Sequence, residues 1–366
     1  MARPFRLPLP RRGRDNPPVS ETTACLPFER PIYEQLSRVE EIRHALDTLE
    51  SDLRTLREGQ ASGNGEAAKR LAEAEHKQAE LAKEWKKEDE KCRALTHEIY
   101  SHLTPWERVQ VARHPSRPYS REYLDKAFRD VVELHGDRGS GDDGAIFTGL
   151  ARVGDRRVLV VAQRKGRDTK ERLASNFGMA RPEGYRKAMA KMRIAERFRL
   201  PVVTLIDTPG AYPGIDAEER GQAWAIAESI LEMCGLRTPI VCVVIGEGGS
   251  GGALAIGVGD RVLILENAYY SVISPEGCAS ILWKSRDRAP DAAEALKITA
   301  NDLLRLGVVD GIVEEPLGGA HRDPDEMARR LRGAVLAALS ELDAVPAETL
   351  TATRYRKYRD LGKHLG

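Results

Sequence analysis

The sequence has little of several features that define large classes of protein. It holds five cysteines in 366 residues, at Cys25, Cys92, Cys234, Cys242 and Cys278, and none of them form a C-x-x-C pair. Without such a pair, and without histidine at ligand spacing, the sequence predicts no zinc site within this chain. An odd number of scattered cysteines is typical of reduced thiols, so we expect a cytoplasmic protein.

Long apolar runs and an excess of one charge are also lacking. No run approaches the ~20 apolar residues of a membrane span. The first residues contain Arg and Pro but no apolar core of a signal peptide. Lys plus Arg is 57 and Asp plus Glu is 56, a net charge of +1. We therefore expect no membrane and no nucleic-acid partner, while 41% hydrophobic residues allow a substantial core.

Glycine, by contrast, is concentrated in one segment. Five of the eleven residues from Ile245 to Ala255 are glycine, and they follow a β-branched apolar run at 239–244 that is typical of a buried strand. Small apolar residues at 253–258 then indicate a helix. Glycine permits close backbone approach and a helix start offers unpaired N–H groups, so the segment suits negative charge.

This segment has more than one interpretation. A phosphate P-loop would need Lys and then Ser or Thr after the last glycine, but Ala253 and Leu254 follow Gly252. A dinucleotide site is weakly indicated, because Glu266 has about the right spacing but the segment lies late in the chain. Backbone donors for an oxygen that becomes an anion during reaction fit best. A tight turn that packs a helix on a sheet is the purely structural alternative.

A second glycine loop has the same context. The apolar run 200–206 ends in Asp-Thr-Pro-Gly-Ala-Tyr-Pro-Gly at 207–214. Two similar strands that each end in a glycine loop are predicted to be neighbours in one sheet. Sites in open α/β sheets form at the carboxyl ends of strands, so we expect both loops at the same edge.

Longer motifs give the chain a family resemblance. The 207–214 loop, Gly-Glu-Gly-Gly-Ser-Gly-Gly-Ala-Leu at 246–254 and Ser-Pro-Glu-Gly-Cys-Ala-Ser-Ile-Leu-Trp-Lys at 274–284 resemble the α subunit of bacterial acetyl-CoA carboxylase carboxyltransferase. Asn-Phe-Gly-Met at 176–179 and Glu-Pro-Leu-Gly-Gly-Ala-His-Arg at 315–322 fit the same family. The resemblance extends over nearly the whole chain, in the right order.

The fold class expected is α/β. Repeated strand–loop–helix units predict a largely parallel sheet, and the resemblance implies a crotonase-like body, the ClpP/crotonase ββα superhelix, with an N-terminal helical hairpin extension. Leucines and other apolar residues spaced by three and four from Leu36 to Leu56 predict the first hairpin helix. The expected divisions are a disordered tail at 1–23, a hairpin and linker at 24–118, the carboxyltransferase domain at 119–345, and a basic helix or tail at 346–366.

The resemblance also implies the reaction and its partners. A carboxyl group passes from carboxybiotin, supplied by the biotin carboxyl carrier protein, to acetyl-CoA, giving malonyl-CoA for fatty acid synthesis. The active site lies between this chain and a β subunit in an α2β2 heterotetramer, which works with biotin carboxylase. The hairpin is expected to form a subunit interface. Zinc is expected on the β subunit, with no metal in this chain, and the choice of acyl-CoA also lies there.

The residues implied for catalysis carry no reactive side chain. By position, the backbone N–H groups of Gly251 and Gly252 would face the biotin ureido oxygen as it becomes an anion. The residues expected to line the biotin pocket are Gly210, Ala211, Tyr212, Gly248, Gly249 and Ala253.

Two rival functions remain open. The first is another CoA enzyme of the same broad fold, such as a hydratase or a decarboxylase. Hydratases have a segment similar to Gly-Gly-Gly-x-Glu-Leu at this loop, whereas here Ala255 and its neighbours supply no carboxylate. The missing carboxylate counts against hydration. The other rival is a scaffold subunit that contributes no donors.

We interpret Glu276 as an acid in the first turn of a helix capped by Ser274, and His321 as structural.

Local patterns predict the elements around the loops. Gly154 and Asp155 indicate a hairpin turn between two strands, residues 121–135 an amphipathic helix, and 182–198 a helix opened by proline. The basic stretch from Gln163 to Arg181 is expected to be a long loop.

Overall fold

The computed structural model describes residues 25–59, 65–139 and 141–362. The expected tail at 1–23 therefore lies outside the described residues. The described chain falls into two compact units that divide between Leu103 and Thr104. We call them the helical unit and the α/β unit.

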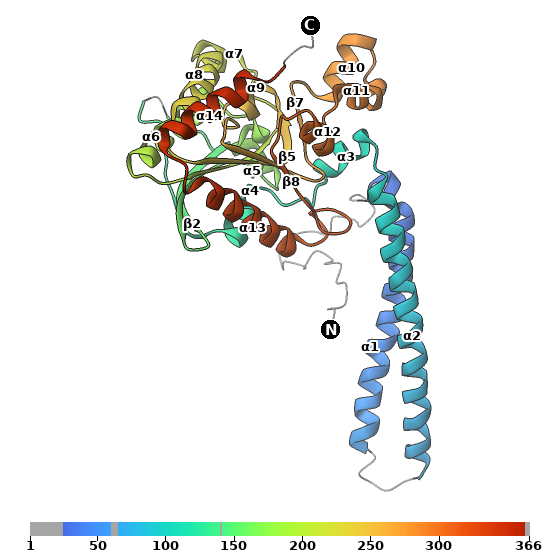
Figure 1. Ribbon diagram of the computed structural model, residues 1–366. Coiled ribbons are helices and arrows are strands. Elements are labelled where there is room, and N and C mark those ends of the chain that lie inside the picture. Colours follow the sequence, from blue (N-terminus) through green and yellow to red (C-terminus); the bar gives the residue numbers. More distant parts are fainter. Residues whose placement is uncertain (1–24, 60–64, 140, 363–366) are drawn as a thin grey trace. The chain divides into compact units, whose positions relative to one another are not determined.

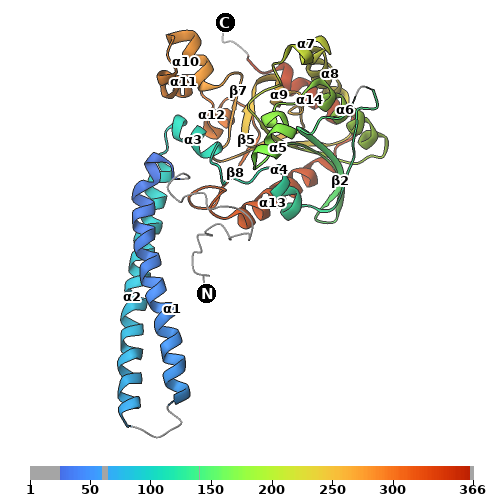
Figure 2. The same ribbon diagram turned by 180° about the vertical axis from the view of Figure 1, so that it is seen from behind.

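The helical unit is a hairpin of two long helices, as the apolar spacing predicts. Figures 1 and 2 show the pair side by side. Gln35 donates to the Glu88 carboxylate across the pair at 2.8 Å, and Val39, Ile42 and Leu53 of the predicted stripe are buried. Its elements are a 3-10 turn η2 (Pro27–Glu29), α1 (Arg30–Gly59) and α2 (Gly65–Ser101).

The α/β unit is built on one twisted, mixed sheet. The strand order is β1-β2-β3-β4-β5-β6-β8, with β7 paired to β5. The first three strands are antiparallel neighbours and the rest pair in parallel. The strands are β1 (Arg129–Glu133), β2 (Ile146–Val153), β3 (Arg156–Gln163), β4 (Val202–Thr208), β5 (Ile240–Gly249), β6 (Arg261–Leu265), β7 (Tyr269–Ser271) and β8 (Gly311–Val313).

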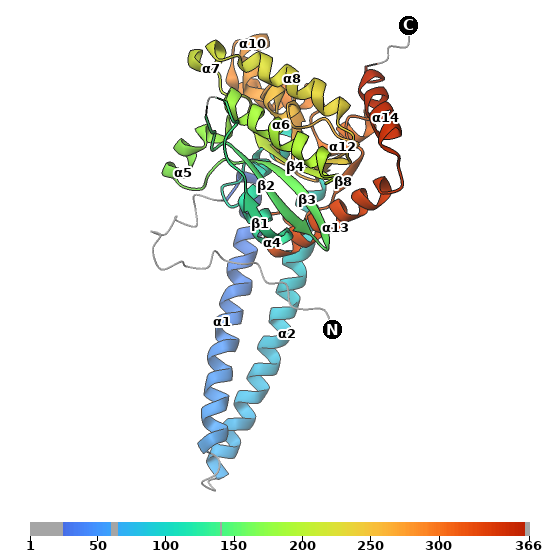
Figure 3. The same ribbon diagram turned by 90° about the vertical axis from the view of Figure 1, so that its left-hand side faces the viewer.

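Helices cover the sheet. Figure 3 shows α6 and α8 stacked on one face, with α4 and α13 together on the other. The helices of this unit are α3 (Pro105–Ala112), α4 (Ser120–Ala127), α5 (Thr169–Ala174), α6 (Pro182–Arg197), α7 (Ile215–Glu219), α8 (Gln222–Gly235), α9 (Ser250–Leu254), α10 (Pro275–Trp283), α11 (Ala289–Leu296), α12 (Ala300–Arg305), α13 (Pro324–Leu342) and α14 (Ala347–Arg359), with 3-10 turns η4 (Asn176–Gly178) and η5 (Arg286–Arg288).

The central strand β5 is the longest and is buried throughout. Its first half pairs with β4 and β6, and its last residues, from Glu247 to Gly249, pair with β7. The carboxyl ends of β3, β4 and β5 therefore meet at one edge of the sheet, which is where the two glycine loops were expected.

The division expected at residue 118 differs from the structure. Residues 104–118 group with the α/β unit, because Arg117, although it lies in a proline-containing stretch, is buried in an ion pair with Glu315. The C-terminal stretch forms a helix as expected, α14, and this helix packs within the α/β unit: its Arg354 is 1% exposed and donates to Asp260 at 2.7 Å and 3.0 Å.

The helix expected at 121–135 is wrong in its second half. The helix α4 ends at Ala127, and Arg129–Glu133 pair with β2 as an edge strand. The hairpin turn at Gly154 and the helix opened by Pro182 are confirmed. Within the residues that the structure describes, no helix is both long and apolar enough to cross a membrane.

Candidate active site

The two glycine loops meet at the carboxyl ends of β4 and β5. A Cβ on Gly252 would lie 2.5 Å from the backbone nitrogen of Ala211 and 2.5 Å from the carbonyl carbon of Gly210. A Cβ on Gly249 would lie 2.2 Å from the Pro209 carbonyl oxygen. Only glycine permits this approach, so the contact explains why the second loop has glycine at 249 and 252.

The helix after the second loop begins earlier and is shorter than the sequence predicts. Instead of residues 253–258, α9 spans Ser250–Leu254, so Gly251 and Gly252 lie in its first turn. Its cap residue Gly249 makes no side-chain cap hydrogen bond. Ser250 takes a left-handed conformation, with φ of 52°. N–H groups at such a start have no partner within the helix.

The expected pocket residues do not all have the same surroundings. A Cβ on Gly210 would meet nothing within 4 Å, so that position faces open space. The ring of Tyr212 lies under Arg181, with the guanidinium 4.5 Å from the ring centroid. Gly248, by contrast, is covered by the Tyr270 ring, and Ala253 is fully buried.

A strained turn lies beside the first loop. Asn176, Phe177 and Gly178 all have positive φ, at 47°, 56° and 83°. Such a conformation is costly for Phe. Thr208 Oγ1 donates to the Gly178 carbonyl at 2.6 Å, which ties this turn to the end of β4. The turn is part of the expected long loop at 163–181, which also contains the short helix α5.

Three neighbouring strands each bring a charged side chain to this edge. Lys165 follows β3, Asp207 lies near the end of β4, and Glu247 lies near the end of β5. The Lys165 Nζ lies 2.6 Å from Asp207 Oδ1 and 2.7 Å from Glu247 Oε1. Asp207 Oδ1 also accepts from the Glu247 N–H at 2.9 Å. This fixes the bulge where the β4–β5 register shifts.

Arg113 extends the charged cluster. It donates to Glu247 Oε2 at 2.6 Å and to Glu276 Oε1 at 2.5 Å, while the Tyr269 hydroxyl donates to Glu247 at 2.6 Å. Burial alone would raise the pKa of Glu247, but Lys165 and Arg113 outweigh it and lower that pKa to about 2. The same cations keep Glu247 ionised at neutral pH.

Glu276 has a second role that its sequence position does not indicate. Ser274 caps α10 as predicted, accepting from the Gly277 N–H. Glu276 does lie in that first turn, but its carboxylate forms an ion pair with Arg113. It therefore links α10 to the segment after α3.

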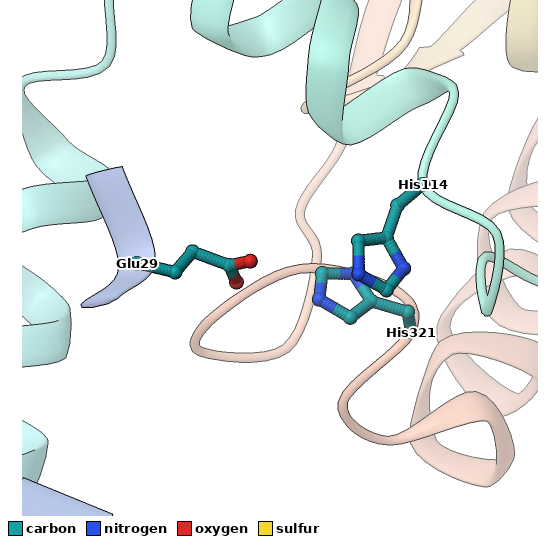
Figure 4. Close-up of side chains that lie close together, drawn as sticks. All are labelled: Glu29, His114 and His321. Atoms are coloured by element: carbon teal, nitrogen blue, oxygen red, sulfur yellow. The ribbon is translucent and has the colours of Figure 1, made fainter. Parts of the chain in front are cut away.

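Two further buried polar contacts involve the segment that follows α3. His321 stacks on His114, with ring centroids 3.9 Å apart (Figure 4). Arg117 donates to the Ile245 carbonyl at 3.0 Å, just before the second glycine loop. His321 therefore packs within the α/β unit.

Reasoning from sequence found the glycine loops and missed the charged cluster around Lys165. A signal for part of it existed: Asp207 and Glu247 each stand where a buried apolar run gives way to a glycine loop, at the edge where sites form. Arg113 gave no signal, since its partner Glu247 is 134 positions away in the sequence.

Known proteins place the chain in a family. The family model described as acetyl co-enzyme A carboxylase carboxyltransferase-like matches residues 57–362. Acetyl-coenzyme A carboxylase carboxyl transferase subunit alpha of Methylococcus capsulatus is 53% identical over 92% of this chain and 96% of its own length. The proteins of the same name from Rhodopirellula baltica and Thermus thermophilus are 60% identical (74% of this chain, 85% of theirs) and 57% identical (82% and 96%).

Solved structures share the fold of a large part of the chain. Transcarboxylase 12S, with hydrolysed methylmalonyl-coenzyme A bound, gives a TM-score of 0.51 at 21% identity, and the match covers 62% of this chain and 42% of that one. A Pseudomonas malonate decarboxylase hetero-tetramer in complex with coenzyme A gives a TM-score of 0.50 at 17% identity, and the match covers 59% of this chain and 86% of that one. At these identities the likeness concerns the fold alone, which is crotonase-like.

Proposed function

The chain belongs to the acetyl-coenzyme A carboxylase carboxyltransferase family, as an alpha subunit, and from that premise we propose how its own residues serve the reaction. The family's chemistry is biotin-dependent: a carboxyl group is transferred to acetyl-CoA, which gives malonyl-CoA for fatty acid synthesis. The enzyme is therefore a transferase, and this chain is one part of it.

Gly251 and Gly252 supply the backbone donors on the biotin side. As the carboxyl group leaves carboxybiotin, negative charge develops on the ureido oxygen. N–H groups fixed in the first turn of α9 stabilise that charge without having to reorganise, and loss of one such donor typically costs about 10²–10³ in rate. Gly210, Ala211 and Tyr212 line the same pocket from the first loop.

The observation that carries this proposal is the backbone contact between the two loops. Gly252 lies against Gly210 and Ala211 with no room for a Cβ, so the two loops pack backbone against backbone. The donors are thereby preorganised. Gly210 faces open space, and a substrate can approach there. Gly248, Gly249 and Ala253 form the wall behind the pocket.

Carboxybiotin reaches the site as a substrate on the biotin carboxyl carrier protein. The β subunit supplies the acetyl-CoA side, the zinc and the choice of acyl-CoA, in an α2β2 assembly that works with biotin carboxylase in the cytoplasm. Large exposed apolar side chains support a partner surface on the α/β unit: Ile215, Trp224 and Leu231 on α7 and α8 are 75%, 71% and 74% exposed. The helical hairpin serves as a further subunit interface.

The first test is the reverse reaction, malonyl-CoA with free biocytin. It is run with this chain alone, with a candidate β subunit alone, and with the two co-expressed. We expect turnover only in the mixture, together with co-elution as a larger complex. Turnover by this chain alone would contradict the composite site, since the chain would then carry its own acyl-CoA site.

A second test separates a catalytic subunit from a scaffold. Gly251→Val and Gly252→Val are each co-expressed with the β subunit. We expect loss of turnover while the complex still forms. Gly333→Ala, a control in α13 where a Cβ meets nothing within 4 Å, should keep full turnover. Normal turnover of both valine variants would leave only the scaffold function.

A further inference from the structure

Gln163 joins the two glycine loops through one side chain. It is the last residue of β3 and is 0% exposed. Its Oε1 accepts from the Asp207 N–H at 2.9 Å, at the start of the first loop. Its Nε2 donates to the Gly252 carbonyl at 2.8 Å, in the second loop. The two bonds fix the orientation of the amide, because one end must accept and the other must donate.

The Gly252 carbonyl depends on this bond because the helix does not supply one. In an α-helix the carbonyl of Gly252 would accept from the N–H of Ile256, but that N–H donates to Ala253 instead. The Tyr185 hydroxyl is a second donor to the same carbonyl, at a longer 3.4 Å. The preceding carbonyl, of Gly251, accepts from Ala255 at 2.9 Å.

The Gly252 carbonyl needs a fixed partner because glycine itself restrains the backbone so little. Two consecutive glycines have the widest choice of backbone torsions, so the directions of their N–H groups need external restraint. The Gly251–Gly252 peptide is held through Ala255. The next peptide, Gly252–Ala253, is held through Gln163, and with it the ψ angle of Gly252.

We propose that Gln163 is a positioning residue for carboxyl transfer: by holding the Gly252 carbonyl against the first glycine loop, it fixes the place of the backbone donors at Gly251 and Gly252. This inference rests on the proposed function of those two glycines. Gln163 acts through the backbone and touches no substrate. It sets the position of Gly252 relative to the first loop at the biotin side, so it affects the rate of transfer and leaves acyl-CoA binding unchanged.

Three variants, each co-expressed with the β subunit, test this role. Gln163→Leu removes both hydrogen bonds of the Gln163 amide, to the Asp207 N–H and to the Gly252 carbonyl. Tyr185→Phe removes only the longer bond to the Gly252 carbonyl. Thr238→Val is the matched control: it removes a buried hydrogen bond from Thr238 Oγ1 to the Leu200 carbonyl, 2.8 Å long, at the opposite end of the strands.

The measurements are kcat and KM in the reverse reaction with malonyl-CoA and biocytin, the number of malonyl-CoA sites per complex by equilibrium dialysis, and the fraction of this chain that co-elutes with the β subunit. For Gln163→Leu we expect kcat to fall about tenfold to a hundredfold, as small misplacements do. Its KM for malonyl-CoA and its number of sites should stay at the wild-type values. Tyr185→Phe should lose about threefold or less, since a long neutral hydrogen bond contributes little.

A purely structural role would produce a different pattern. Partial unfolding of Gln163→Leu would lower the fraction of this chain recovered in the complex with the β subunit, in proportion to the apparent kcat, and Thr238→Val would then lose as much activity. Either result, or a wild-type kcat in Gln163→Leu, would overturn the proposal.

The valine variants of the glycines separate this inference from its premise. If Gly252→Val abolishes turnover and Gln163→Leu does not, the glycine donors stand and only the role of Gln163 fails. If Gly251→Val and Gly252→Val both keep full turnover, the proposed function fails, and the role of Gln163 fails with it.

Discussion

Arg117 and Glu315 form a two-pronged ion pair that is closed to solvent. The guanidinium donates to the two carboxylate oxygens at 3.0 Å and 2.6 Å, and the side chains are 1% and 0% exposed. Glu315 also accepts from the backbone N–H groups of Asn267 and Ala320. The pair connects the segment after α3 to the loop after β8, and Arg117 holds the carbonyl that precedes the second glycine loop.

We therefore expect Arg117→Met to be strongly destabilising. The substitution leaves a buried carboxylate without its cation, and such a loss typically costs about 3–5 kcal/mol in the free energy of unfolding. Arg129→Met is the matched control, because Arg129 and Asp155 are exposed and such pairs contribute about 1 kcal/mol or less. Urea denaturation of the two variants measures the difference. Equal losses would show that the buried pair adds nothing specific.

Acid should weaken the fold through the same carboxylate. Burial opposes ionisation of Glu315, but Arg117 and several hydrogen bonds lower its pKa to about 2. The folded pKa is below the unfolded value of about 4.3. The ionised Glu315 therefore stabilises the fold fully above the unfolded pKa of about 4.3. Its contribution is lost as the pH falls toward the folded pKa of about 2.

The measurement is the free energy of unfolding at several pH values between 7 and 3. We expect little change from 7 to 5 and a steady decline below about 4.5. In Arg117→Met the pKa of Glu315 is no longer lowered by the cation, so the decline should be smaller. The same slope in both proteins would contradict a lowered pKa of Glu315.

Sequence patterns predicted the elements whose cause is local. The strands before the two glycine loops have buried apolar runs, and Ser274 and Pro275 mark the start of α10. At 129–133 the local pattern misled: Val131 and Val132 lie on an edge strand and are 39% and 59% exposed. Pairing with β2 overrides the helical spacing there.

The charged cluster at the site could be predicted only in part. Asp207 and Glu247 follow buried runs, so their place at the sheet edge follows from topology. Their contact with Lys165 depends on the order of β3, β4 and β5, which periodicity does not give. The inward turn of Arg117 depends on a partner 198 positions away. Long-range ion pairs leave no local pattern in one sequence.

Lys165→Met should also be costly. Its ammonium group forms ion pairs with Asp207 and Glu247, and all three side chains are at most 12% exposed. Removing the cation leaves two neighbouring buried carboxylates, for which we expect a loss of about 3–5 kcal/mol. The control is Lys126→Met, which removes an exposed pair with Asp325. Thermal denaturation compares them, and similar shifts in Tm would contradict the prediction.

The contact between Gly252 and Ala211 gives a sharper comparison of two adjacent glycines. A Cβ on Gly252 would lie 2.5 Å from backbone atoms of the first loop, whereas a Cβ on Gly251 has only ordinary contacts, at 3.5 Å and beyond, with Ile226. Alanine keeps the backbone N–H at either position. The two variants therefore differ in whether the loops must separate.

We expect Gly252→Ala to force the loops apart. Overpacking of this kind costs about 1–3 kcal/mol, and displaced donors should lower kcat of the α–β complex about a hundredfold. Gly251→Ala should lose clearly less stability and clearly less kcat. The assay is the reverse reaction with malonyl-CoA and biocytin, with urea denaturation alongside. If the two variants lose equal activity, close approach of the loops does not set the rate, and the donor directions must be fixed elsewhere.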